Sequence, residues 1–244
     1  MKNFSHPFFD EIYFFKTLNS SFKKAESMIK NYEVNGNFLI LSEKEKSSVG
    51  RDKNIWLAPL GGLWFTMGLN GFKFQSDLTI FTGIILHKTV LKFLPEKKKN
   101  NLFLKWPNDI YYQDKKIAGI LTNNYPFYDY HTIGIGVDTN ISPQLPDNSA
   151  TSLKSIIDKD VDNELFLKEF FDLITEELPQ FLENGLDFEY FNNHSLLKGR
   201  EITITTMFDK YSGISMGINK KGAILLKMQG GLIQPFYSGT IDKI

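Results

Sequence analysis

The pattern of apolar residues changes near residue 195, and this change limits the folds open to the chain. Before it, apolar residues recur at helical spacing or in short continuous runs, which is typical of helices packed on a buried sheet. After it, Glu201–Thr205 alternates strictly between polar and apolar residues, and further short runs follow between turns. We therefore expect a mixed α+β domain over residues 1–195 and a small β domain over residues 196–244.

The second domain consists of short strands joined by turns. After the alternating strand come runs at 212–218, 223–228 and 232–237, separated by Asn-Lys-Lys-Gly and Gln-Gly-Gly turns. This series predicts a partly closed β-barrel. A barrel of this size buries little apolar surface, so we expect it to pack against the larger domain for stability.

The first domain combines helices with strands. Helical spacing predicts helices over 19–32 and 78–94, and a third that begins after Asp162, whose side chain can cap it. A turn at 113–115 predicts a hairpin. The expected strands are 37–41, 63–67, 102–106, 110–112, 117–121 and 132–137.

Charge and cysteine content exclude several classes of protein. The chain has 28 Lys and Arg against 28 Asp and Glu, so it lacks the bulk positive charge that grips nucleic acid or an anionic membrane. We expect neither DNA nor a membrane as a partner. Having no cysteine excludes disulfides, thiolate metal sites and a catalytic thiol. No signal peptide or membrane-length apolar run is visible, which predicts a soluble, cytoplasmic protein.

A polar, glycine-containing loop at 47–56 is the first candidate for a ligand site. Gly50 lets backbone approach a ligand closely, and Arg51 offers a planar fork for a phosphate or carboxylate. Lys53 adds a second cation. An ordinary solvated loop has the same composition, so this segment alone does not decide the matter.

The pentapeptide Lys105–Asp109 is the second candidate. Asp109 offers a hard oxygen ligand for Mg²⁺, and Asn108 a polar contact for a nucleotide, although Asn and Asp after Pro are also ordinary turn residues. Farther on, Lys116 begins an apolar strand and can direct its ammonium into a pocket. The alternative is a lysine at an exposed strand end.

Two glycines, Gly134 and Gly136, interrupt an otherwise β-branched strand. Such glycines indicate a bulge or a ligand that lies against the backbone. They do not form a dinucleotide-binding fingerprint, because the third glycine and the following helix are absent.

Taken in this order, the segments resemble the biotin protein ligase family. The Lys-Trp-Pro-Asn-Asp pentapeptide is highly specific to that family, and so is its seven-residue separation from the lysine of the Lys-x-Ala-Gly-Ile-Leu segment. Residues 217–226 look like the small C-terminal domain of these ligases. Few residues precede the first matching segment, so the resemblance indicates the ligase-only type, without the DNA-binding domain of the bifunctional repressor-ligases. The matching segments are Gly50–Arg51, Trp56–Pro59, Gly61–Thr66, Lys105–Asp109, Lys116–Leu121 and Gly134–Gly136.

The resemblance implies a fold and a reaction. The fold is a mixed sheet with helices, like the catalytic core of class II aminoacyl-tRNA synthetases, followed by an SH3-like β-barrel. In the reaction, the biotin carboxylate attacks the α-phosphate of Mg·ATP to give biotinoyl-AMP and pyrophosphate. A lysine of a biotin carboxyl carrier protein, with acetyl-CoA carboxylase as the expected one, then displaces AMP. The resemblance also allows a homodimer.

The resemblance assigns roles to individual residues. Lys116 and Arg51 are the implied catalytic residues, and Asp109 the implied Mg²⁺ ligand. The implied biotin-binding residues are Thr17, Leu18, Asn19, Ser47, Gly50, Arg51, Asp52, Lys53, Thr66, Lys116 and Gly119. The implied ATP-binding residues are Arg51, Lys53, Trp56, Asn108, Asp109, Asp138 and Asn140.

Several positions depart from the family pattern. Ser47 stands where a glutamine is expected, Asp52 replaces a glycine, and Asp138 replaces an asparagine near the adenine or ribose. Asp52 puts a negative charge beside a phosphate site, so we expect an active ligase that retains its adenylate less well. Two alternatives stay open: a lipoate ligase or octanoyl transferase of the same fold, and a catalytically weakened biotin-binding homologue.

Overall fold

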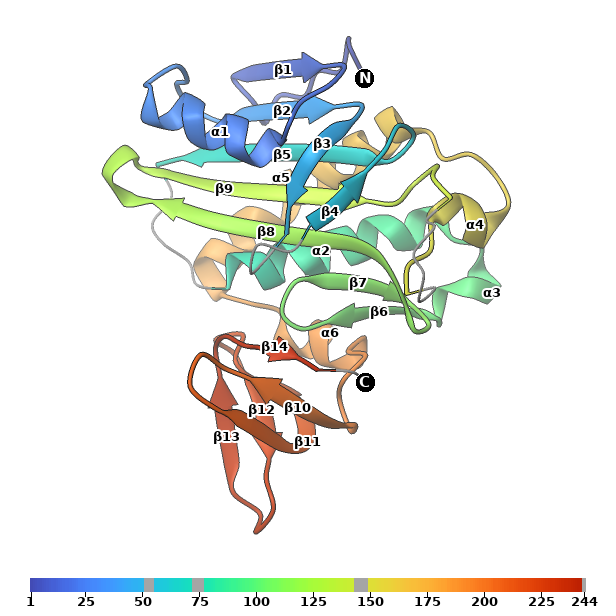
Figure 1. Ribbon diagram of the computed structural model, residues 1–244, viewed down its shortest axis with the longest axis vertical. Helices are drawn as coiled ribbons and strands as arrows, with labels where there is room; N and C mark the ends of the chain where they lie inside the picture. Colours follow the sequence, from blue (N-terminus) through green and yellow to red (C-terminus); the bar gives the residue numbers. More distant parts are fainter. Residues whose placement is uncertain (51–54, 72–76, 143–148, 243–244) are drawn as a thin grey trace.

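The computed structural model describes residues 1–50, 55–71, 77–142 and 149–242. A mixed sheet lies at its centre (Figure 1). Its strands are β1 (Glu11–Phe15), β2 (Phe38–Ser42), β5 (Leu63–Asn70), β6 (Leu102–Lys105), β7 (Asp109–Tyr112), β8 (Lys115–Tyr125) and β9 (Tyr130–Val137). They follow the order β1-β2-β5-β9-β8-β7-β6, in which β1 and β2 are parallel and all other neighbours are antiparallel.

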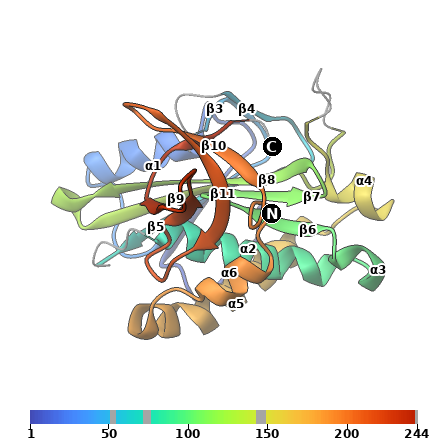
Figure 2. The same cartoon turned by 90° about the horizontal axis from the view of Figure 1, so that it is seen from below.

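The central strands are buried because both faces of the sheet are covered (Figure 2). One face carries helix α1 (Ser21–Lys30) and a hairpin of β3 (Glu45–Val49) and β4 (Ile55–Ala58). The other carries α2 (Leu78–Phe93) and α5 (Asn163–Asn184). A strand covered on both sides is apolar at nearly every position, and β2 is buried throughout, with Ser42 as its single polar residue.

The sequences of the two long helices, α2 and α5, suit their positions on the sheet. Helix α2 is apolar almost all round because the sheet covers one side and α5 the other, with Phe81 stacked on Phe181 at 4.3 Å between ring centroids. Asp162 caps α5, as predicted, by accepting hydrogen bonds from the backbone N–H groups of Glu164 and Leu165. Shorter helices are α3 (Glu96–Lys99), α4 (Leu153–Ile157), α6 (Phe188–Asn193) and a 3₁₀ turn at Pro126–Tyr128.

The C-terminal module is a second, antiparallel sheet. Its strands are β10 (Glu201–Thr205), β11 (Lys210–Ile218), β12 (Ile224–Lys227), β13 (Ile233–Phe236) and β14 (Thr240–Ile241), in the order β13-β12-β11-β10-β14. The predicted fold class, a mixed α+β sheet domain followed by a small β module, is confirmed. The closure of this module into a barrel and the domain boundary at 195/196 stay predictions.

The module packs against the larger domain, as its size predicted. Buried residues of the two parts belong to one continuous apolar core. The indole Nε1 of Trp106 donates to the carbonyl of Gly222 at 2.9 Å, and the Asn192 amide bonds both backbone groups of Ile218. The module is therefore held at a defined place beside the turn between β6 and β7.

The structure differs from the sequence prediction in the segment expected to be a loop at 47–56. Part of it forms the hairpin of β3 and β4, while residues 51–54 lie outside the described residues. The polar sequence of β3 hid this strand: the hairpin lies over the sheet, and Glu45 and Ser48 are its polar residues that are buried. Strands β1 and β14 were not predicted either. No helix within the described ranges has the length and apolar character needed to cross a bilayer.

Candidate functional site

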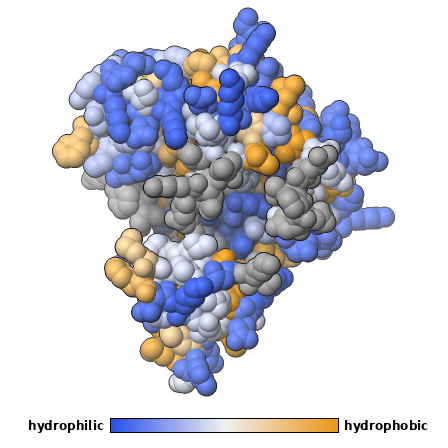
Figure 3. Space-filling view, viewed as in Figure 1, coloured by the Kyte–Doolittle hydropathy of each residue, from blue (hydrophilic) through white to orange (hydrophobic). Residues whose placement is uncertain are grey.

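A cavity of about 900 Å³ opens on the sheet face that carries α1 and the β3–β4 hairpin. The molecule is hollowed on the face drawn in Figure 3, between the larger domain and the C-terminal module. The size suits a small organic ligand or cofactor. The sheet side of the cavity is lined by Thr66, Asn108, Asp109, Lys116, Gly119, Gly134, Gly136 and Asp138.

One wall of the cavity carries charge. Lys116 lies near the start of β8 and Asp109 begins the neighbouring β7, and the Lys116 Nζ lies 2.7 Å from the Asp109 Oδ1. The amide of Asn108 donates to the carbonyl of Ile120 at 2.7 Å, which fixes the turn beside them. We call Asp109, Lys116 and Asp138 the charged wall. An ammonium held in this way is positioned to attract an anionic ligand.

Trp56 lies across the floor of the cavity. Gly119 and Gly136 are paired neighbours on β8 and β9, and a Cβ added to either would lie 3.1 or 2.8 Å from the indole. The Lys116 ammonium lies 5.0 Å from the indole centroid, within range of a cation–π contact. The indole Nε1 is buried and has no hydrogen-bond partner among the described residues. The indole therefore packs on a backbone left bare by glycine.

Gly134 likewise leaves room for a second aromatic side chain to pack on the backbone. A Cβ at this position would lie 2.7 Å from the ring of Phe22 in α1. The pairing of β9 with both neighbours continues through Gly134 and Gly136 without a shift. The expected bulge is therefore wrong. Aromatic side chains approach the backbone at these glycines, and a ligand that lies against it stays a prediction.

A second part of the cavity wall is made of hydroxyl groups around one buried acid. Glu45 accepts from the backbone N–H of Ser21 at 3.0 Å and from the hydroxyl of Ser48 at 2.6 Å. The Ser21 hydroxyl lies 2.9 Å from that of Thr66 on β5. Ser20, beside them, caps α1. We call Ser20, Ser21, Glu45, Ser48 and Thr66 the hydroxyl wall.

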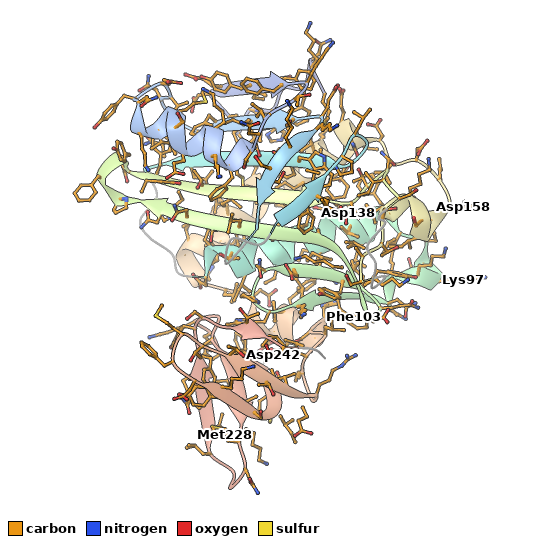
Figure 4. The ribbon with its side chains drawn as sticks, in the orientation of Figure 1. Lys97, Phe103, Asp138, Asp158, Met228 and Asp242 are labelled. Atoms are coloured by element: carbon orange, nitrogen blue, oxygen red, sulfur yellow. The ribbon has the colours of Figure 1, made fainter. Side chains whose placement is uncertain are left out.

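Asp138 follows the end of β9 and is the most deeply buried acid of the cavity (Figure 4). Burial raises the pKa of Asp138 to about 8, although the nearby Lys116 ammonium opposes the shift. On β7, burial first and the Asp109 charge second raise the pKa of the Tyr111 hydroxyl well above its ordinary value. Burial therefore favours the neutral form of both side chains.

The structure brings most of the predicted site residues together. Gly50, Trp56, Thr66, Asn108, Asp109, Lys116, Gly119 and Asp138 all line the cavity.

Five others lie elsewhere. Four of them lie next to the hydroxyl wall but do not line the cavity: Thr17, Leu18, Asn19 and Ser47. Leu18 forms an isolated β-bridge with Glu45, and the Ser47 N–H donates to the Asn19 carbonyl at 2.9 Å. The fifth is Asn140, whose side-chain amide donates to the Val161 carbonyl at 2.9 Å and accepts from the Val161 N–H at 2.7 Å. Their assigned ligand roles stay predictions.

Three predicted residues, Arg51, Asp52 and Lys53, lie outside the described residues. The expected cationic loop and the effect of its aspartate therefore stay predictions.

The sequence analysis missed the hydroxyl wall apart from Thr66. One signal was present: a serine just before the first helix is a common N-cap, and a helix N-terminus suits polar ligands. Glu45 and Tyr111 gave no such signal, because an acid in a polar run and a tyrosine in a strand are both ordinary. Only the tertiary fold shows them at the cavity.

The carboxylates of the cavity form no complete metal site among the described residues. Within the described residues, no group of three His, Cys, Asp or Glu side chains is placed to hold one. Asp109 is a single carboxylate on the cavity wall, and Mg²⁺ is commonly held by one or two carboxylates together with substrate phosphates. The residues therefore fit an ion that enters with a phosphate ligand.

Comparison with known families gives two matches. The sequence model of the biotin/lipoate A/B protein ligase family matches residues 15–140. The model described as the biotin protein ligase C terminal domain matches residues 198–243. Together they take in both sheets of the structure except for most of β1.

Individual proteins give the same result. The bifunctional ligase/repressor BirA of Bacillus subtilis is 25% identical over 92% of this chain and 71% of its own length. BirA of Escherichia coli is 28% identical over 83% of this chain and 65% of its own. The structure of a biotin protein ligase from Aquifex aeolicus in complex with biotin and ATP matches with a TM-score of 0.80 and 27% identity, over 96% of this chain and 98% of that one.

Proposed function

This chain belongs to the biotin/lipoate A/B protein ligase family, and we propose that it is a biotin protein ligase, which uses ATP to attach biotin to a carrier protein. The observation that carries the proposal is the position of Lys116. Its ammonium is held 2.7 Å from Asp109 in a cavity large enough for an organic ligand. A fixed positive charge is needed there, because biotin and ATP are both anionic and repel each other.

The first step joins a carboxylate to a phosphate. Both groups are negative, so their approach costs electrostatic energy unless a fixed cation lies between them. We assign this role to Lys116, with Arg51 as a second cation. The carboxylate of biotin attacks the α-phosphorus of ATP, the α–β bridging bond breaks, and the products are biotinoyl-AMP and pyrophosphate.

The two walls suit the two substrates. The ring system of biotin is neutral and has both hydrogen-bond donors and acceptors, which matches the hydroxyl wall around Thr66. Gly119, an expected biotin contact, lies under the Trp56 indole and the Lys116 side chain, so its contact with biotin stays a prediction. ATP would lie toward Asn108, Asp109 and Trp56, and Mg²⁺ would enter with it, held by its phosphates and Asp109. A bound Mg²⁺ would neutralise phosphate charge.

The second step transfers biotin to the carrier. We propose that the amine of a carrier lysine attacks the carbonyl carbon of biotinoyl-AMP, so that an amide forms and AMP leaves. A biotin carboxyl carrier protein, such as that of acetyl-CoA carboxylase, has the required lysine. Membership of this family makes such a protein the expected acceptor.

Exchange of labelled pyrophosphate into ATP tests the first step alone. We expect exchange that depends on biotin and Mg²⁺, and none with lipoate or octanoate in place of biotin. Exchange with lipoate but not with biotin would assign the chain to the lipoate branch of the family. Biotin binding without any exchange would contradict the proposal and indicate a binding protein.

A further inference from the structure

Asp138 is a buried acid at the cavity whose carboxyl group has no hydrogen-bond partner among the described residues. The side chain is 5% exposed. Its backbone is fixed: the N–H donates to the Ile117 carbonyl at 2.9 Å, and the carbonyl accepts from the N–H of Leu153 at 2.8 Å. Its carboxyl oxygens are not fully buried atoms, and the residue lines the cavity, so a ligand there that bonds them gains affinity.

Few charged groups of the described residues lie around Asp138. From β8, Lys116 faces it, but the Lys116 ammonium is paired with Asp109 of β7. From α4, Lys154 pairs with Asp160 at 2.8 Å. From β5, the neighbouring Leu63 and Trp64 do not titrate. The other titratable residues on the described cavity wall are Lys44, Glu45, Lys46 and Tyr111.

Burial therefore decides the protonation state of Asp138. The loss of hydration raises its pKa to about 8, and the attraction of Lys116 does not reverse the shift. A protonated carboxyl group has one O–H donor and one free acceptor, as an amide does, whereas a carboxylate only accepts. A carboxylate here would also repel the phosphates of a nucleotide.

We propose that Asp138 binds ATP as a neutral carboxylic acid that donates a hydrogen bond to the nucleotide, and that loss of its proton weakens ATP binding. The inference rests on the proposed function, because it takes ATP as the ligand of this cavity. In this chain Asp138 then does the work of an amide side chain, but only below the pH at which it ionises.

The test measures the dissociation constant of a non-hydrolysable ATP analogue, with biotin and Mg²⁺ present, across pH 6 to 9.5. For the unaltered protein we expect a constant that is nearly flat up to pH 7 and about tenfold higher at pH 9. Asp138→Asn keeps a donor at every pH, so its constant should stay low. The ratio of the two constants cancels the titration of ATP itself.

Asp158→Asn is the matched control. Asp158 follows α4 on the outer side of the molecule and is exposed (Figure 4), so this variant should follow the unaltered protein. A ratio that does not change with pH would overturn the inference, and so would loss of binding in Asp138→Asn at pH 7. Absence of analogue binding at every pH would overturn the inference and the proposed function together. Binding without pyrophosphate exchange would overturn the proposed function alone.

Discussion

The two walls of the cavity differ in how their polar groups are satisfied. On the hydroxyl wall, both carboxylate oxygens of Glu45 accept hydrogen bonds, and the hydroxyls of Ser21 and Thr66 bond each other. On the charged wall, Lys116 and Asp109 hold each other, while the carboxyl of Asp138 has no partner among the described residues.

This difference separates a wall that is preformed from one that is completed by its ligand. The hydroxyl wall is a closed hydrogen-bond network, which resists distortion and presents a fixed shape. On the charged wall, Lys116 and Asp109 can exchange their mutual contact for contacts with a ligand, and the Asp138 carboxyl can gain a partner. Binding of phosphates would therefore redistribute these interactions. We expect substitutions on the two walls to affect different substrates, and the following experiments test that expectation.

The largest effect should come from Lys116→Ala. Removing the fixed cation should lower biotin-dependent pyrophosphate exchange at least about a hundredfold, as loss of a single transition-state donor does in other enzymes. Biotin binding by calorimetry should change much less. Lys115→Ala is the control, because the adjacent side chain does not line the cavity. Near-normal exchange by Lys116→Ala would contradict the assignment.

Gly136→Ala should displace Trp56 and so disturb the charged wall. The added Cβ would lie 2.8 Å from the indole Nε1, and overpacking of this kind costs about 1–3 kcal/mol. We expect a changed tryptophan emission spectrum and about tenfold weaker ATP binding. In Gly83→Ala, the nearest neighbour of the new Cβ lies at 3.6 Å, so this control should leave both unchanged. An unchanged emission spectrum in Gly136→Ala would refute the packing argument.

Thr66→Val tests the hydroxyl wall. The substitution keeps the shape of the side chain and removes one partner of Ser21, which costs about 1 kcal/mol and should weaken biotin binding severalfold. ATP binding at saturating biotin should be unaffected. Thr89→Val removes an equally buried hydroxyl that donates to the Ile85 carbonyl at 2.8 Å, away from the cavity. If Thr66→Val weakens ATP more than biotin, the division between the walls is wrong.

The smallest effect is on stability. Because the folded-state pKa of Asp138 is about 8 and its ordinary value is 3.8, the folded protein binds the extra proton between these values. The free energy of unfolding therefore falls as pH rises toward 8. Between pH 7 and 8 this loss is about 1 kcal/mol, and Asp138→Asn should lack it. Urea denaturation of both proteins at the two pH values measures the difference. An equal change in the free energy of unfolding between pH 7 and 8 in the two proteins would contradict it.

How much the sequence predicted depended on the distance between partners along the chain. Asp109 and Lys116 belong to one hairpin, so their approach to 2.7 Å follows from a local turn that the sequence indicates. The pairing of Ser21 with Glu45 joins a helix start to a strand across 24 residues, and no local pattern indicates it. The charged wall was therefore largely predictable, and the hydroxyl wall was not.

Asn140 shows the same limit from the other side. Its sequence position suggested a ligand contact, yet its amide bonds the backbone of Val161, 21 residues away. An amide can satisfy a chain turn or a ligand equally well, and only tertiary structure shows which. The burial of Asp138 was likewise invisible, because an acid after a strand reads as a surface residue.

The bond from Trp106 to Gly222 has a consequence for protein engineering. Trp106 belongs to the same pentapeptide as Asn108 and Asp109, but its side chain faces the C-terminal module. A chimaera that exchanged this module for that of another ligase would have to present a carbonyl at the same place. Otherwise the graft would leave a buried indole N–H unpaired two residues from the turn that we propose binds the nucleotide.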